Sequence, residues 1–241
     1  MTTSEYKPNK KEQLFSKYYK ELIWETIFAR AHLKLSERLE KYKADYLKEL
    51  NQAPHFFILT IRAHIDDALL TLSRILNVHK DSLNIWKFLN FVEQNREIFS
   101  EEVFSQRIKD NPYHGSLVKS HKSVTCKEIE EDRRKLENLE DTITKVKDLR
   151  DTVLAHHDRR SIVRGRITAE THDVQREKLY EVIDSLVMTL NRYSSAYNSS
   201  SFSEKFSGED DIHGIMDSIR FHIQERKKQL DKLKKQARKK R

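Results

Sequence analysis

Glycine and proline are so scarce that they restrict the fold more than any other feature of this sequence. Only 4 Gly and 3 Pro occur in 241 residues. Hairpins and β-sandwiches need tight turns at short intervals, and these two residue types supply many of them. Leu, Lys, Glu and Arg, which favour helices, are abundant instead. We therefore predict an all-α protein, a helical bundle of about six or seven helices with an extended basic C-terminal helix.

Composition also limits where the chain is expected to act. Charged residues make up 35% of it, and no apolar run approaches the roughly 20 residues that span a bilayer. The first residues, MTTSEYKPNKKEQLF, lack the apolar core of a signal peptide. A single cysteine, Cys126, offers no partner for an internal disulfide. We expect a cytoplasmic protein with no membrane partner.

Apolar residues recur every three or four positions through most of the chain, as in amphipathic helices. The buried faces predicted from this spacing carry Leu14, Tyr18, Leu22, Ala29, Leu33 and Leu47 on the first helix and Ile58, Ile61, Ile65, Leu69, Leu72 and Leu76 on the second. A third stripe, on the helix over residues 179–197, consists of Leu179, Val182, Leu186, Leu190, Tyr193 and Tyr197. The first predicted helix can be broken once, Asp81 or Ser82 can cap the third, and residues 109–123 are predicted to form a loop. We take the Ser-rich residues 198–210 as a flexible connector. The predicted helices cover about residues 10–50, 54–78, 83–95, 98–108, 126–157, 179–197 and 211 onward.

The net charge is concentrated at one end of the chain. Residues 225–241 hold ten Lys or Arg and two acidic residues, which accounts for the whole formal net charge of +8. Such a tail either attracts RNA phosphates or is a solvated, frayed helix end. We expect residues 1–9 to be disordered, residues 10–225 to form one helical domain, and residues 226–241 to be a separate basic tail.

An arginine stands where the helix over residues 126–157 should bury an apolar side chain. Ile129, Leu136 and Ile143 recur every seven residues and define an inward-facing seam. Seven residues after Ile143 comes Arg150, and seven more lead to His157. Since a buried guanidinium without partners is too costly for a stable core, we expect Arg150 to face a cleft, a polar network or another subunit.

The spacing of Arg150 and His156 is by itself weak support for a functional site. Histidine near a helix C-terminus and arginine beside acidic residues are also ordinary stabilising features. Similar spacings occur by chance from Arg74 to His79 and from Arg107 to His114. The residues from Arg107 to His114 include Asn111-Pro112 and therefore cannot form one helix. The residues from Arg74 to His79 extend beyond the end of a predicted helix.

The stretch R-D-T-V-L-A-H-H-D, residues 150–158, resembles the signature of HEPN domains, an all-helical superfamily. In that signature a polar residue follows an arginine, and a histidine comes four to six positions further on. Arg150, Asp151 and His156 fit, and His157 fits as well, so the choice between the two histidines stays open. The segments IRAHIDDALLTLSRILN at 61–77 and LNRYSSAY at 190–197 resemble the AbiU-like HEPN branch, named from abortive-infection phage defence.

The resemblance implies a homodimer in which two Arg/His motifs share one cleft. Many HEPN proteins are metal-independent endoribonucleases, often toxins with a neutralising antitoxin partner, and others only bind RNA, a nucleotide or a protein. Two hypotheses follow. The protein is either an endoribonuclease that acts in phage defence or in a toxin-antitoxin system, or it is a non-catalytic binding module. A third is a bundle that only scaffolds other proteins. We expect no cofactor and no metal.

RNA can be cut without a metal because its 2′-hydroxyl can attack the adjacent phosphate, leaving a 2′,3′-cyclic phosphate. His156 could transfer a proton, a dimer-related copy could transfer the other, and Arg150 could bind the phosphate oxygens. Asp151 could orient either residue. His157, Asp67 and Arg74 are further candidates for lining the cleft, although Asp67 and Arg74 can equally be ordinary surface residues.

Other kinds of site find little support in the sequence. It has no Gly-rich phosphate loop, no G-x-S-x-G and no His-Glu-x-x-His. Six scattered histidines show no metal-ligand spacing, so we expect them at the surface or between helices. They are His32, His55, His64, His79, His114 and His121.

Overall fold

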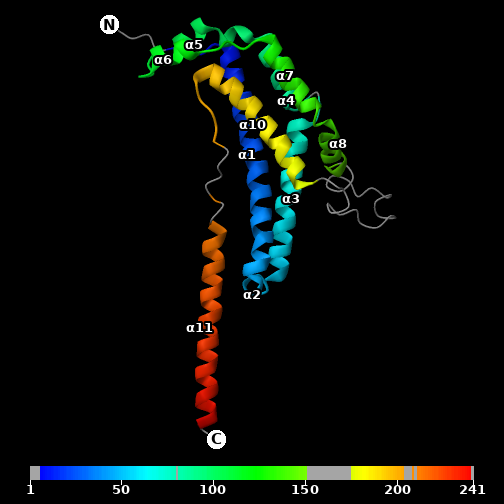
Figure 1. Cartoon of the computed structure of the whole chain (residues 1–241), viewed down its shortest axis with the longest axis vertical. Helices are drawn as coiled ribbons and strands as arrows, with labels where there is room; N and C mark the ends of the chain where they lie inside the picture. Colours follow the sequence, from blue (N-terminus) through cyan, green and yellow to red (C-terminus); the bar gives the residue numbers. More distant parts are fainter. Residues whose placement is uncertain (1–5, 80, 151–174, 204–207, 209–210, 240–241) are drawn as a thin grey trace. The chain divides into compact units, whose positions relative to one another are not determined.

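The structure is a computed structural model that describes residues 6–79, 81–150, 175–203, 208 and 211–239. These residues form ten α-helices, one 3-10 helix and no strand (Figure 1). The prediction of an all-α fold is confirmed, with somewhat more helices than predicted. They are α1 (Lys10–Asp45), α2 (Leu47–Leu50), α3 (Pro54–Leu76), α4 (Ile85–Gln94), η1 (Arg96–Phe99), α5 (Glu101–Arg107), α6 (His114–Ser120), α7 (Cys126–Glu137), α8 (Glu140–Leu149), α10 (Arg176–Asn198) and α11 (Asp211–Lys239).

Two of the predicted boundaries were wrong. The helix predicted over residues 126–157 is interrupted between α7 and α8, where the Leu139 N–H donates to the Leu136 carbonyl and tightens the chain by one residue. The predicted loop over residues 109–123 contains α6, whose His114 Nε2 lies 3.0 Å from Ser105 Oγ of α5. This tertiary contact holds a helix too short to be stable alone, which local periodicity cannot reveal.

The cap predicted for the third helix was also misplaced. Asn84, not Asp81 or Ser82, precedes α4, and its Oδ1 accepts the Lys87 N–H at 2.9 Å. Asn84 is fully buried, so its side chain closes the helix end from inside the protein.

The chain divides into two compact units. Unit 1 contains residues 1–30 and 68–204, and unit 2 contains residues 31–67 and 205–241. Helices α1 and α3 therefore each contribute residues to both units. The boundaries predicted for the domain and the tail stay predictions.

The core of unit 1 is built around α10, which packs against η1, α5, α7 and α8 (Figure 1). The stripe predicted on this helix is confirmed, since all six of its members are buried: Leu179, Val182, Leu186, Leu190, Tyr193 and Tyr197. Phe15 of α1 completes this core, with its ring centroid 4.6 Å from that of Tyr197 and 5.1 Å from that of Phe99.

Three apolar residues predicted on buried helix faces are exposed. Leu14 and Leu47 near the ends of the first predicted helix are 37% and 56% exposed, and Ile58 of α3 is 61% exposed. Next to Leu14, Phe15 is 1% exposed and takes the buried position at this end of α1. Further along the helix the predicted face is confirmed, since Leu22, Ala29 and Leu33 are buried. The other members of the predicted α3 face, from Ile61 to Leu76, are buried or partly buried.

A buried ion pair in unit 1 joins α1 to α5. Glu12 Oε1 accepts from Arg107 Nη2 at 2.6 Å and from Arg107 Nε at 3.0 Å, and these side chains are 1% and 8% exposed. The guanidinium also donates to the carbonyls of Ile98 and Tyr197 at 2.7 and 2.5 Å. Arg107 is therefore a core residue, and its spacing to His114 is accidental, as the sequence indicated.

The core of unit 2 joins α11 to α2 and to its parts of α1 and α3. The buried residues are Leu39, Tyr42, Tyr46, Leu50, Ile61 and Met216. Arg220 of α11 donates to Glu49 at 2.8 Å, and its guanidinium lies 4.0 Å from the centroid of the Tyr46 ring.

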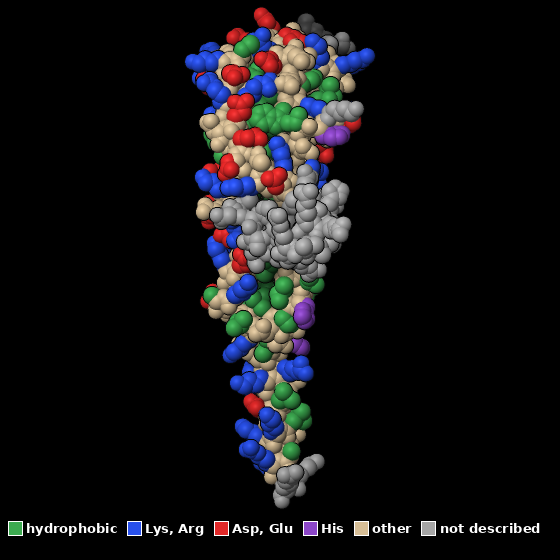
Figure 2. Space-filling view, turned by 90° about the vertical axis from the view of Figure 1, so that its right-hand side faces the viewer, with side chains coloured by type: hydrophobic (Ala, Val, Ile, Leu, Met, Phe, Trp, Pro, Cys, Tyr) green, Lys and Arg blue, Asp and Glu red, His purple; other side chains and the backbone are tan. Residues whose placement is uncertain are grey.

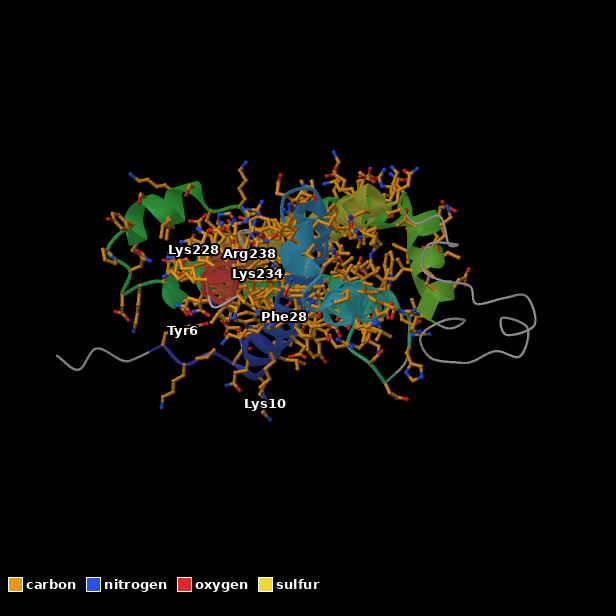
Figure 3. The ribbon with its side chains drawn as sticks, turned by 90° about the horizontal axis from the view of Figure 1, so that it is seen from below. Tyr6, Lys10, Phe28, Lys228, Lys234 and Arg238 are labelled. Atoms are coloured by element: carbon orange, nitrogen blue, oxygen red, sulfur yellow. The ribbon has the colours of Figure 1, made fainter. Side chains whose placement is uncertain are left out.

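The basic tail continues α11 without interruption, and its side chains from residue 226 to 239 are all exposed. Figure 2 shows Lys and Arg side chains gathered along this part of the helix. Three of them, Lys228, Lys234 and Arg238, are labelled in Figure 3, where α11 is seen nearly end-on.

Candidate functional site

Helix α8 places Arg150 at its C-terminal end, as the seven-residue register predicts. Ile143, Val146 and Leu149 of this helix are buried, with at most 2% of each side chain exposed. Arg150 is the C-cap residue and is only partly buried. It lines a pocket of about 490 Å³. The register thus brings the guanidinium to a pocket, one of the environments expected for it.

The Arg150 pocket lies wholly within unit 1, and three parts of the chain complete it. Glu21 and Glu25 come from α1, and Arg74 comes from α3. The segment between α3 and α4 supplies the remaining residues, which are Asn77, His79, Ser82 and Leu83. The volume of the Arg150 pocket falls within the range of about 300–1,000 Å³ that is usual for ligand sites. Two guanidinium groups, one imidazole and two carboxylates therefore share one opening.

Arg74 is held in the pocket by its neighbours. Its Nε donates to Glu25 Oε1 at 3.1 Å, and its Nη2 donates to Thr71 Oγ1 at 3.1 Å. Burial raises the pKa of Glu25, and the Glu21 carboxylate adds to this, although the Arg74 charge opposes both. A guanidinium has five N–H groups, so three of those on Arg74 make no hydrogen bond with the described residues.

The comparison with protein families gives one result for this chain. The model of the AbiU2 family, within the HEPN group, matches residues 12–217. The chain belongs to the AbiU2 family of HEPN proteins. The match covers every described residue that lines the Arg150 pocket. No curated protein and no solved structure matches the chain.

Only one residue of the AbiU2 chain's Arg/His motif falls in the described part of the structure. Arg150 lies at the pocket, whereas Asp151, His156 and His157 lie outside the described residues. The structure therefore describes the position of Arg150 alone, and the roles predicted for all four residues stay predictions.

The two further candidates on α3 have different surroundings. Arg74 lines the Arg150 pocket, but Asp67 is not among the residues that do so. Asp67 Oδ2 instead lies 3.1 Å from His32 Nε2 within unit 2. Sequence reasoning had treated the two residues alike because they are seven positions apart on one helix.

His32 and His64 form a direct contact between α1 and α3, as expected for interhelical histidines. Their Nδ1 atoms are 3.0 Å apart. Burial lowers the pKa of His64, and the nearby His32 lowers it further, while Asp67 opposes the shift. At least one of the two rings must therefore be neutral for this hydrogen bond to exist.

His79 is the pocket residue that sequence reasoning passed over. It is exposed and stands three residues beyond the end of α3. The signal was present in its spacing from Arg74, which resembles that of the HEPN motif, but the pattern leaves the helix. Only the return of the chain toward α4 brings His79 to the same pocket as Arg150.

Among the described residues, no group of His, Cys, Asp or Glu is arranged to hold a metal ion. No helix in the described part of this AbiU2 chain has the length and apolar character needed to cross a bilayer.

Proposed function

We propose that this AbiU2-family protein is a metal-independent endoribonuclease of abortive infection or of a toxin-antitoxin system, with RNA bound at the Arg150 pocket of a homodimer. The observation that carries the proposal is the position of Arg150. Arg150, the arginine of the predicted Arg/His motif, lines a pocket with a second arginine, Arg74, from another helix. Two guanidinium groups at one opening suit a phosphodiester, since each can donate two parallel hydrogen bonds to phosphate oxygens.

The reaction needs only proton transfer and stabilisation of negative charge. The 2′-hydroxyl loses its proton to a base, its oxygen bonds to phosphorus, and the bond from phosphorus to the 5′-oxygen breaks. The leaving oxygen takes a proton, which gives a 2′,3′-cyclic phosphate and a free 5′-hydroxyl. In the proposal His156 performs one transfer, and its copy in the second subunit performs the other.

Arg150 and Arg74 have different tasks in this scheme. Arg150 binds the phosphate and does so more strongly as charge develops in the transition state. Arg74 is fixed by Glu25 and Thr71, and therefore presents its remaining N–H groups in one orientation. A fixed donor stabilises the developing charge without first having to reorganise.

Cleavage of RNA in EDTA tests the proposal. The wild type should cut, and Arg150→Ala should lose at least 100-fold in rate, about 2.7 kcal/mol of transition-state stabilisation. Arg62→Ala is the matched control, since Arg62 is 52% exposed, pairs with Asp66 on the same helix, and is not among the described residues that line the pocket. His156→Ala and His157→Ala, compared side by side, identify the acting histidine.

Expression in cells tests the biological role. Wild-type protein should arrest growth, and Arg150→Ala should relieve the arrest while the protein stays folded and abundant. A wild type that binds RNA but cuts none would instead favour the non-catalytic module. A function that persists after both Arg150 and His156 are replaced would favour the scaffold. Growth arrest relieved by a co-expressed protein would reveal an antitoxin.

A further inference from the structure

We infer that His79 donates a hydrogen bond from Nε2 to an RNA phosphate in the Arg150 pocket, and that it is neither the acid nor the base of the reaction. This inference rests on one part of the proposed function, that RNA binds at the Arg150 pocket. It does not require that the protein cleaves the RNA. It adds a substrate contact outside the Arg/His motif. Three features carry it: the turn that holds His79, the hydrogen bond to its ring, and the charges around it.

The backbone on either side of His79 is fixed by hydrogen bonds. The His79 N–H donates to the Asn77 carbonyl at 3.0 Å. The His79 carbonyl accepts from both the N–H and the Oγ of Ser82, each at 3.4 Å. Asn77 and Ser82 also line the pocket, so the same turn that forms part of its wall holds His79 there.

The imidazole receives a hydrogen bond that determines which nitrogen carries the proton. The Asp81 backbone N–H donates to His79 Nδ1 at 3.3 Å. A backbone N–H can only donate, so Nδ1 must keep its lone pair and the proton of the neutral ring lies on Nε2. Protonation of Nδ1 would break this bond. His79 is therefore a donor through Nε2, with no lone pair there to act as a base.

The distal nitrogen is available for a ligand. His79 Nε2 makes no hydrogen bond with any of the described residues, and the side chain is exposed. Among the described residues, the charged ones that line the same pocket are Glu21, Glu25, Arg74 and Arg150. Beside the two guanidinium groups, an anionic ligand is recognised through the geometry of its hydrogen bonds, and the Nε2–H donor adds one.

Two substitutions separate this role from the alternatives. In His79→Asn, Oδ1 takes the position of Nδ1 and can still accept the Asp81 N–H, but the distal donor is lost. In His79→Gln, the amide reaches the position of Nε2 and can still donate, but it cannot titrate. If His79 only holds the turn, His79→Asn should function. If His79 contacts a phosphate, His79→Gln should function. If His79 is an acid or a base of the reaction, neither variant should function.

The experiment measures binding of a 2′-O-methyl RNA oligonucleotide, which cannot be cleaved, and cleavage of the matching RNA in EDTA between pH 5 and 8. Salt is held constant because RNA affinity depends steeply on it. His79→Asn should bind roughly 10- to 100-fold more weakly, the loss of one hydrogen bond to a charged group. His79→Gln should stay within a few-fold of the wild type, with both limbs of the pH profile unchanged. The control is His55→Asn, an exposed histidine on α3 outside the pocket.

The outcomes separate this inference from the proposed function. Unchanged affinity in His79→Asn overturns the phosphate contact, whatever the protein cleaves. Loss of one limb of the pH profile in His79→Gln shows acid–base catalysis and also overturns it. Binding without cleavage overturns the proposed catalysis alone, because the affinities still test His79. A wild type that does not bind RNA overturns both.

Discussion

Arg107 and Arg150 belong to one unit of the protein, yet their replacement should have opposite consequences. Arg107→Ala should remove stability and leave the chemistry intact, whereas Arg150→Ala should do the reverse. The reason is that Arg107 is 8% exposed and pairs with the 1% exposed Glu12, while Arg150 lies at a pocket. The comparison separates an arginine of the core from an arginine of the site.

The size of the Arg107 effect follows from the groups left behind. Replacing it leaves the Glu12 carboxylate with the Tyr6 hydroxyl and the Asn9 N–H as its donors among the residues that the structure describes. Two backbone carbonyls, those of Ile98 and Tyr197, also lose a donor. Breaking a buried ion pair from one side costs about 3–5 kcal/mol. At about 2–4 °C per kcal/mol for a chain of this size, the melting temperature should fall by roughly 6–20 °C.

Urea unfolding of the wild type, Arg107→Ala and Arg62→Ala measures this. The exposed Arg62 control should lose less than about 1 kcal/mol. Replacing both Glu12 and Arg107 by apolar residues should cost less than Arg107→Ala alone, since no charge is then stranded. A loss below about 1 kcal/mol in Arg107→Ala would refute the buried-pair reasoning.

The same pair should give stability a dependence on pH. Burial acts to raise the pKa of Glu12, but hydrogen bonds from Tyr6, Asn9 and Arg107 outweigh it and hold the pKa below its ordinary value. The stability from this carboxylate is therefore present above its unfolded pKa of about 4.3 and is lost as pH falls through the folded value. The difference between wild type and Arg107→Ala should shrink over that range, and a difference that grows toward low pH would contradict the assignment.

Three further predictions address the pocket, a helix cap and the tail. Glu25→Gln should bind RNA a few-fold more tightly at neutral pH, because the amide oxygen can still accept from Arg74 while a negative charge leaves the pocket; weaker binding in a titration would contradict this. Asn84→Ala should cost about 1 kcal/mol in thermal unfolding through loss of the α4 cap, and an unchanged melting temperature would refute it. Deleting residues 226–241 should weaken low-salt RNA binding and flatten its salt dependence by about 0.7 per lost phosphate contact; unchanged affinity would show that the tail does not touch RNA.

The local features of the sequence determined much of the fold. The stripe on α10 and the break between α1 and α2 could be predicted because each depends on neighbours within one or two helical turns. The seven-residue spacing also predicted the position of Arg150 correctly, because this spacing depends on residues within two helical turns. It did so even though the chain tightens at Leu139 between α7 and α8. A one-residue tightening left Leu136 and Ile143 both buried.

The features that were missed depend on tertiary contacts. Helix α6 is held by the contact of His114 with Ser105, and Asn84 outcompetes its neighbours as a cap from a fully buried position. Asp67 and Arg74 could not be told apart by spacing, because the difference lies in what faces them: His32 for one and Glu25 for the other. His79 reaches the pocket only because the chain turns back after α3.

The central claim is that the Arg150 pocket cuts RNA without a metal. Its most direct test is the analysis of the ends that the purified wild type leaves on a defined RNA in EDTA, beside folded Arg150→Ala. We expect 2′,3′-cyclic phosphate and 5′-hydroxyl ends from the wild type and no such products from Arg150→Ala. Equal cleavage by both proteins, dependence on added metal, or 5′-phosphate ends would contradict it.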